Sequence, residues 1–203
     1  MIKNSYRKIL SHIFCLLLLA VFFGCAAMRT PTPLSSSTVK QNGINVGFDV
    51  DDTLLFSTPA FKKADDSGET AYSENWWTIV NKSDGENSIV KKVTEKILNG
   101  HKQKGDEIFM ITSRGEAGGD YLRDFLNKIF GVKKENIYFE HDKADRIKKL
   151  RISIYYGDSD SDITASQDAG AKGIRIMRSP KSSYEGKYHP GEFGEEIIPD
   201  SEE

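Results

Sequence analysis

Acidic residues gather in two short segments of the chain that could together bind a cation. Residues 49–52 (Asp-Val-Asp-Asp) and residues 157–162 (Gly-Asp-Ser-Asp-Ser-Asp) each follow an apolar stretch. On an extended chain Asp49 and Asp51 face the same way, because side chains alternate between two sides. Carboxylates aimed at one point repel each other and need a cation, a shared proton or solvent. Taken alone, each segment could also be a solvated acidic turn.

Hydroxyl and basic side chains follow other apolar stretches. Thr112, Ser113 and Arg114 end or directly follow one of them. A hydroxyl and basic groups placed near two acidic segments suit a hard cation together with an anion. Carboxylate oxygens favour Mg²⁺ over soft metals, and Mg²⁺ commonly bridges protein acids to phosphate.

Strand and helix patterns alternate along the chain and predict how these groups are positioned. The predicted strands are Ile44–Val50, Glu107–Thr112, Ile137–Phe139, Ile152–Tyr156 and Ile174–Met177. The predicted helices are Ile89–Ile97 ended by Gly100, Tyr121–Ile129 ended by Gly131, Lys143–Leu150, and Ile163–Ala169 ended by Gly170. This order predicts an α/β fold, a Rossmann-like three-layer parallel sheet with helices on both faces. Ligands of such sheets bind beyond the carboxyl ends of the strands, where the acids and hydroxyls fall.

Two segments do not fit this alternation. Residues 56–87 have few periodic apolar positions and contain Trp76 and Trp77, so we interpret them as a small cap insertion after the first strand. The tail, residues 184–203, is rich in glycine and acidic residues, and we expect little regular structure there.

The motifs resemble those of a known enzyme superfamily. Residues 49–53 (Asp-Val-Asp-Asp-Thr) resemble the first motif of haloacid dehalogenase-like phosphatases, Thr112 the second and residues 157–162 the fourth. For the third motif, a lysine, Lys143 has the expected spacing, and the alternatives are Lys148 and Lys149. Longer stretches are similar to the bacterial class B acid phosphatases: Val46–Ser57, Tyr156–Asp160, Gly173–Ile176 and Phe193–Glu196. The resemblance runs from about Val46 to the C-terminus.

The resemblance implies a role for each motif residue. Asp49 is expected to be the nucleophile that forms an aspartyl-phosphate, and Asp51 the general acid and base. One Mg²⁺ per subunit is expected on the Asp49 side chain, the Asp51 backbone carbonyl and Asp158. Phosphate and substrate contacts are expected from Thr112, Ser113, Arg114 and Lys143. Asp162 is expected to orient the metal shell or Lys143, and Arg114 could instead simply pair with an acid.

The resemblance also implies the class of substrate. Phe61, Trp77 and Tyr184 are expected to line a pocket for the leaving group, with Trp76 structural. Such a pocket suits nucleotides and aryl phosphates, and a nucleoside hydroxyl could accept the phosphoryl group. The net charge of -2 gives no basic field for a nucleic acid polymer. A homotetramer is expected, although the linker here is shorter than the stretch before the first motif in the family.

The N-terminal residues are typical of an export signal. Three basic residues precede Ile13–Phe23, an apolar run of about eleven residues, whereas a membrane span needs roughly 20. We therefore expect a signal peptide at 1–27, a linker at 28–43 and the phosphatase domain at 44–203. An alternative is a lipoprotein signal at 1–24 with lipidated Cys25. The protein is expected in the periplasm, with an outer-membrane anchor only if Cys25 is lipidated.

Two other functional hypotheses remain open at this point. The chain could be a surface lipoprotein of phosphatase ancestry that mainly binds a ligand, or a plain cation-binding module. The complete set of Asp49, Asp51, Thr112, Lys143 and Asp158 favours a working phosphatase over both.

Overall fold

The computed structural model describes residues 43–203 of the chain. The predicted signal peptide, both cysteines and nearly all of the predicted linker lie outside the described residues. None of the described helices is both long and apolar enough to cross a membrane.

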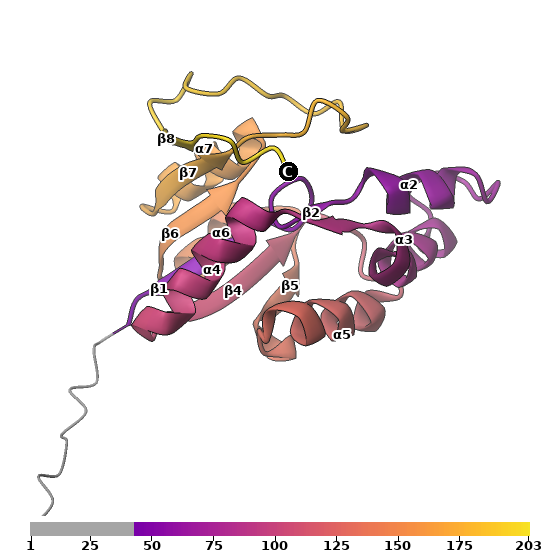
Figure 1. Cartoon of the computed structure of the whole chain (residues 1–203), viewed down its shortest axis with the longest axis horizontal. Coiled ribbons are helices and arrows are strands. Elements are labelled where there is room, and N and C mark those ends of the chain that lie inside the picture. Colours follow the sequence, from indigo (N-terminus) through magenta and orange to yellow (C-terminus); the bar gives the residue numbers. More distant parts are fainter. Residues whose placement is uncertain (1–42) are drawn as a thin grey trace, which may run out of the picture. The chain divides into compact units, whose positions relative to one another are not determined.

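Six parallel strands form the central sheet, in the order β5-β4-β1-β6-β7-β8 (Figure 1). Their bounds are β1 Asn45–Phe48, β4 Glu107–Thr112, β5 Ile137–Phe139, β6 Ile152–Gly157, β7 Lys172–Ile176 and β8 Glu196–Ile198. A separate antiparallel pair consists of β2 (Leu55–Phe56) and β3 (Ile89–Val90). The chain proceeds outward from β1 to β4 and β5, then returns to the other side of β1 with β6. The carboxyl ends of β4, β1 and β6 therefore lie next to one another at the point where the strand order reverses, which is where ligands bind in such sheets.

Helices cover both faces of the sheet. Their bounds are α4 Lys92–Lys104, α5 Gly119–Phe130, α6 Lys143–Lys149 and α7 Asp160–Asp168, with a 3-10 turn at Lys134–Asn136. The side chains of β4, which alternate between the two faces of the sheet, show how the layers form. Ile108 and Met110 join the core under α4 and α5, whereas Phe109 and Ile111 join the core under α6 and α7. The predicted three-layer α/β fold is confirmed.

Residues 56–87, predicted as an insertion, contain α2 (Thr58–Asp65) and α3 (Glu74–Asn87). The two helices contact each other, and α3 also contacts α5 (Figure 1). Trp76 is buried between them, with its indole N–H donating to Asp65 at 2.9 Å. Apolar residues recur only weakly along α3, because several of its buried positions are polar: Asn81, Ser83 and Asp84.

Two predicted segments differ from the structure: the first helix, at both of its ends, and the C-terminal tail. Gly100 does not end a helix: α4 continues to Lys104 and ends at Gly105, whose φ of 82° is the left-handed conformation that favours glycine. Ile89, predicted as helical, lies in β3, because the helix begins only at Lys92. The tail is not irregular throughout, since β8 extends the sheet by pairing in parallel with β7.

Two glycine substitutions test the packing of the strand that carries Asp49. A Cβ on Gly47 would lie 2.5 Å from the buried Tyr155 ring and 2.9 Å from Ile152. Gly47→Ala is therefore expected to lower the free energy of unfolding by about 1–3 kcal/mol. In the control Gly100→Ala, nothing lies within 4 Å of the new methyl group, so helix propensity should stabilise the protein by about 0.5–1 kcal/mol. Urea unfolding measures both, and a Gly47→Ala variant as stable as the wild type would contradict this packing.

Candidate active site

Side chains from three adjacent strand ends meet at one edge of the sheet. Asp49 follows β1, Thr112 ends β4 and Asp158 follows β6. All three are buried. Because these strands are neighbours in the sheet, residues more than a hundred positions apart in sequence lie at one place.

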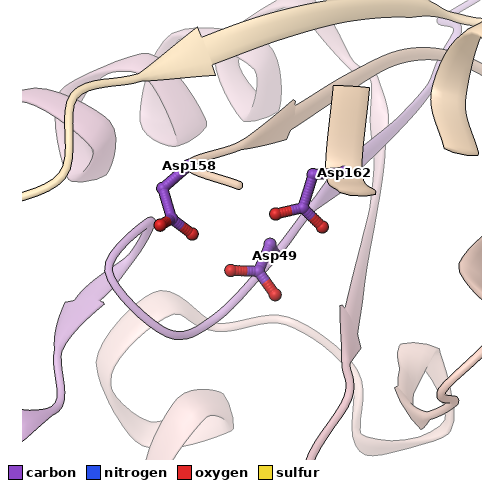
Figure 2. A group of neighbouring side chains, drawn as sticks. All are labelled: Asp49, Asp158 and Asp162. Carbon is purple, nitrogen blue, oxygen red and sulfur yellow. The ribbon is translucent and has the colours of Figure 1, made fainter. Parts of the chain in front are cut away.

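Three buried carboxylates form the centre of this site. Asp49, Asp158 and Asp162 each place a carboxylate oxygen within 4.8 Å of the other two. Figure 2 shows the three side chains turned toward a common space. Burial raises the pKa of Asp49 well above its usual value, Lys143 opposes this effect, and the neighbouring acids add to it. Carboxylates in such a place favour a bound cation.

Lys143 supplies positive charge to the cluster. The side chain is 8% exposed and lies at the first position of α6. The Nζ atom donates to Asp49 Oδ1 at 2.5 Å and to Asp162 Oδ1 at 2.7 Å. Burial lowers the pKa of Lys143, but Asp162 and Asp49 outweigh this and raise it well above the usual value. The alternatives from the sequence, Lys148 and Lys149, are exposed.

Asp162 contacts Lys143 and takes part in capping the N-terminus of α7. Its Oδ2 accepts hydrogen bonds from the backbone N–H and the hydroxyl of Ser159, while Ser159 Oγ accepts from the Asp162 N–H. This reciprocal arrangement is a capping box. Since Oδ1 contacts Lys143 and Oδ2 contacts Ser159, both oxygens of Asp162 are engaged. Asp162 is thus a less available metal ligand than its place in the cluster indicates.

Arg178 contacts the third carboxylate and was not identified from the sequence. Its Nε donates to Asp158 Oδ2 at 2.6 Å, and its guanidinium lies 4.7 Å from the ring centres of both Tyr184 and Tyr188. Burial and Asp162 raise the pKa of Asp158 to about 7, although Arg178 opposes them. In the sequence Arg178 directly follows the predicted strand Ile174–Met177, but no motif around it marks it as a site residue.

The donor set fits a hard divalent cation. Within residues 43–203, Asp49 Oδ2 and Asp158 Oδ1 accept no hydrogen bond, whereas the second oxygen of each contacts Lys143 or Arg178. Both free oxygens belong to carboxylates whose pKa burial raises. No described histidine joins the cluster: His101 bonds Asp106 and Tyr156, and His189 bonds Asp160. Oxygen ligands without nitrogen or sulfur are typical of Mg²⁺ sites.

Asp51 lies beside the cluster and contacts a different cation. The alternation expected of an extended strand does not reach it, because β1 ends at Phe48 and residues 52–54 form a turn. Arg114 donates to both oxygens of Asp51, from Nε at 3.0 Å to Oδ2 and from Nη2 at 2.6 Å to Oδ1. Burial acts to raise the pKa of Asp51, but Arg114 outweighs it and lowers the pKa. Thr112 Oγ1 also donates to this carboxylate, at 3.3 Å.

The cap reaches the site through the same arginine. Arg114 Nη1 donates to Asp84 Oδ2 at 2.6 Å and to Asn81 Oδ1 at 3.1 Å, both on α3. Asn81 Nδ2 donates to two backbone carbonyls of the loop after β4, those of Gly115 and Ala117. Of the two roles considered for Arg114, the structure shows the pairing with acids. Asp84 and Asn81 were not identified from the sequence, where α3 lacks a clear period.

The other residues predicted to contact the substrate do not all lie together. Phe61 and Trp77 belong to one aromatic cluster, 6.1 Å apart, and the Arg114 guanidinium lies 5.3 Å from the Phe61 ring. Tyr184 comes from the C-terminal segment, is half exposed and stacks on Arg178 rather than on either ring. Ser113 is exposed and lines a recess of about 360 Å³ beside Lys143.

Comparisons with known proteins agree with this geometry. Residues 31–187 match the family described as HAD superfamily, subfamily IIIB (acid phosphatase). A class B acid phosphatase of Rahnella sp. (strain Y9602) is 34% identical over 196 residues, covering 87% of this chain and 83% of the relative. A class B acid phosphatase of Salmonella typhimurium is 37% identical over 183 residues, covering 83% of this chain and 77% of the relative.

Solved structures share the fold at low sequence identity. A haloacid dehalogenase-like hydrolase from Streptococcus pneumoniae gives a TM-score of 0.54 at 13% identity, covering 77% of this chain and 93% of that protein. A HAD hydrolase of family IA from Entamoeba histolytica gives a TM-score of 0.54 at 17% identity, covering 77% and 92%.

The contact between the cap and Arg114 predicts a large loss of stability for one cap residue. Asp84→Ala leaves a fully buried guanidinium with half of its charged partners, so we expect the free energy of unfolding to fall by about 3–5 kcal/mol. Glu86→Ala on the same helix is the control, because Glu86 is exposed and pairs only with Lys63 at the surface. That change should stay within about 0.5 kcal/mol. Urea unfolding compares the two variants, and equal effects would contradict an anchoring role for Asp84.

Proposed function

The chain belongs to subfamily IIIB of the HAD superfamily, the class B acid phosphatases, and from this premise we propose that it hydrolyses phosphate monoesters with Asp49 as the nucleophile. One observation carries the proposal. Asp49 is a buried carboxylate with one oxygen bonded to Lys143 and the other free, facing Asp158 at the end of the neighbouring strand. A carboxylate fixed in place by its partner can direct its nucleophilic oxygen at a bound phosphate in one defined direction.

The proposed reaction has two steps. In the first, a carboxylate oxygen of Asp49 forms a bond to phosphorus while the bond from phosphorus to the leaving oxygen breaks, giving an aspartyl-phosphate. Asp51 donates the proton that the leaving oxygen takes up. Because Arg114 lowers the pKa of Asp51, the protonated form that this step needs is populated in acid solution. In the second step Asp51 accepts a proton from the water that attacks the intermediate, and inorganic phosphate leaves. The Asp51 side chain is about one quarter exposed, at 27%, which leaves it accessible to the leaving group and to water.

Lys143 and Thr112 are the proposed contacts for phosphoryl oxygens. An ammonium group has three N–H donors, and two of those of Lys143 are directed at Asp49 and Asp162. The third can donate to a phosphoryl oxygen without breaking either contact. Thr112 ends the adjacent strand, β4, and its single O–H, which donates to Asp51 at 3.3 Å, would turn to a phosphoryl oxygen when the substrate binds. Donors of this kind stabilise the charge that develops on the phosphoryl group.

We propose Mg²⁺ as the cation, one per subunit, held by the Asp49 and Asp158 side chains and the Asp51 backbone carbonyl. The ion would neutralise the charge that otherwise keeps the Asp49 carboxylate away from an anionic phosphate. Asp162 then acts through Lys143, since both of its oxygens are already bonded.

The substrates proposed are small phosphomonoesters such as nucleotides and aryl phosphates. Phe61 lies against Arg114, which bonds Asp51, so an aromatic surface lies close to the proposed proton donor. Phe61 and Trp77 offer ring faces on which a base or an aryl group can stack. A nucleoside hydroxyl that replaces water in the second step would give phosphotransfer. Tyr184 is proposed to contact the leaving group from the C-terminal segment.

Export to the periplasm is proposed from the N-terminal sequence alone. The basic start, the short apolar run and the small residues at 24–27 support a signal peptide. Attachment to the outer membrane is proposed only for a chain lipidated at Cys25. A homotetramer is proposed from the family resemblance.

Removing the nucleophile or the metal should abolish activity. Asp49→Asn keeps the shape of the side chain but removes its charge, so phosphate release from p-nitrophenyl phosphate should fall by about 10³-fold or more. A chelator should stop the wild-type enzyme, and added Mg²⁺ should restore it. Asp145→Asn, at an exposed acid of α6, is the control and should keep wild-type activity. Phosphate release by Asp49→Asn at the wild-type rate would exclude Asp49 as the nucleophile.

Metal binding should distinguish the ligand Asp158 from the supporting Asp162. Asp158→Asn removes a free carboxylate oxygen, so calorimetric titration with Mg²⁺ should detect no binding. Asp162→Asn disturbs Lys143 rather than the ion, and the affinity should fall by about tenfold. If the two variants lose binding equally, Asp162 is itself a ligand and the assignment made here is wrong.

A further inference from the structure

Lys91 is a buried charge that the proposed mechanism does not use. Its side chain is 0% exposed, and it lies between β3 and the first turn of α4. Burial lowers the pKa of Lys91 to about 8, although Asp158 and Asp52 act against this effect. A cation is also unfavourable at the N-terminus of a helix, where the helix dipole is positive. Hydrogen bonds must compensate for a lysine in this position.

Lys91 makes these bonds to two segments that are distant in the sequence. Its Nζ donates to the Asp52 carbonyl at 2.6 Å and to the Met177 carbonyl at 2.7 Å, across 39 and 86 residues. The Lys91 backbone N–H also donates to the Leu54 carbonyl at 2.9 Å. One side chain therefore joins the turn that follows Asp49 to the segment that follows β7.

The first segment needs support because its backbone is strained. Asp52 has a φ of 53°, in the left-handed region that few residues with a side chain adopt. Its carbonyl accepts from Lys91, and its carboxylate accepts from Ser182. Asp51, the proposed proton donor, is the preceding residue. A change in the orientation of the Asp52 carbonyl would therefore also change the orientation of Asp51 next to it.

The second segment carries the arginine that contacts Asp158. Lys91 bonds the oxygen of the peptide between Met177 and Arg178, and the Tyr188 hydroxyl accepts from the N–H of the same peptide at 3.0 Å. The Met177 N–H donates to Ser201 Oγ at 2.8 Å. The peptide that positions Arg178 is therefore held from both sides.

We propose that Lys91 is a positioning residue that fixes the turn after Asp49 against the peptide of Arg178, so that Asp49 and Asp158 direct oxygens at one cation. This inference rests on the proposed function. It predicts that Lys91 acts on metal binding through hydrogen bonds to the backbone, without contact with the ion or the substrate. A neutral side chain of similar length would leave two carbonyls without their donor and would free both segments to move.

The test is calorimetric titration of Lys91→Met with Mg²⁺, together with its thermal unfolding. Methionine fills a similar volume but donates no hydrogen bond, so we expect the Mg²⁺ dissociation constant to rise by about 10–100-fold, as for groups that orient metal ligands. Two controls separate positioning from general damage. Lys92→Met removes an adjacent exposed lysine and should bind Mg²⁺ like the wild type. Leu98→Ala removes a fully buried α4 side chain and should lower the melting temperature while keeping the affinity.

Several outcomes would overturn the inference. One is a folded Lys91→Met protein whose Mg²⁺ affinity stays within about twofold of wild type, because loss of a group that orients metal ligands should weaken binding by about tenfold or more. Another is a Leu98→Ala variant that loses as much affinity. If Lys91→Met does not fold, Lys91→Gln replaces it, because the shorter amide keeps an N–H donor but does not span both the Asp52 and Met177 carbonyls. Several-fold weaker Mg²⁺ binding by that variant supports the inference, and unchanged binding overturns it. A wild-type protein that binds no Mg²⁺ would instead contradict the proposed function.

Discussion

Like charges buried at one edge of the sheet are the constraint on which the rest of the structure depends. Asp49, Asp158 and Asp162 are buried, and each places a carboxylate oxygen within 4.8 Å of the other two. Among the described residues, Lys143 and Arg178 are the cationic side chains that bond to their carboxylates. Each of these cations leaves one carboxylate oxygen of Asp49 or Asp158 free. The cluster is thus built to accept further positive charge, and the same oxygens are those needed for the proposed chemistry.

The fold satisfies this constraint by bringing its parts from separate elements. The parallel sheet supplies Asp49, Thr112 and Asp158 at adjacent strand ends, and α6 supplies Lys143. The cap contributes Asp84, which shares Arg114 with Asp51 and so links the helix α3 to the proposed proton donor. These contacts join residues that are distant in the sequence. A protein assembled in this way has its site only when the whole domain is folded.

The sequence predicted the layers and the motif residues because both depend on local signals. The strands at Glu107–Thr112 and Ile137–Phe139 have the predicted bounds, and Gly131 ends α5 as predicted. Lys143 was favoured over two neighbouring lysines, and only its side chain of the three is buried. The predicted end of the first helix at Gly100 is wrong, because core packing at Leu98 and His101 continues α4 past this glycine to Lys104.

Residues that act through long-range hydrogen bonds could not be predicted. Lys91, Asp84 and Arg178 have no motif, because their role depends on which backbone carbonyl or acid lies opposite in the folded chain. β8 is a different case: Ile197 and Ile198 are β-branched residues that favour a strand, but two such residues in an acidic, glycine-rich tail are too short a signal to predict one.

The central claim is that carboxylates from two loops share a single ion. A crystal structure of the protein grown with Mn²⁺ in place of Mg²⁺, with anomalous data collected at the manganese edge, tests it most directly. We expect one anomalous peak per chain, at bonding distance from an oxygen of both Asp49 and Asp158, while Lys143 stays on Asp162. A site without a peak, or a peak that contacts only one of the two carboxylates, would contradict it.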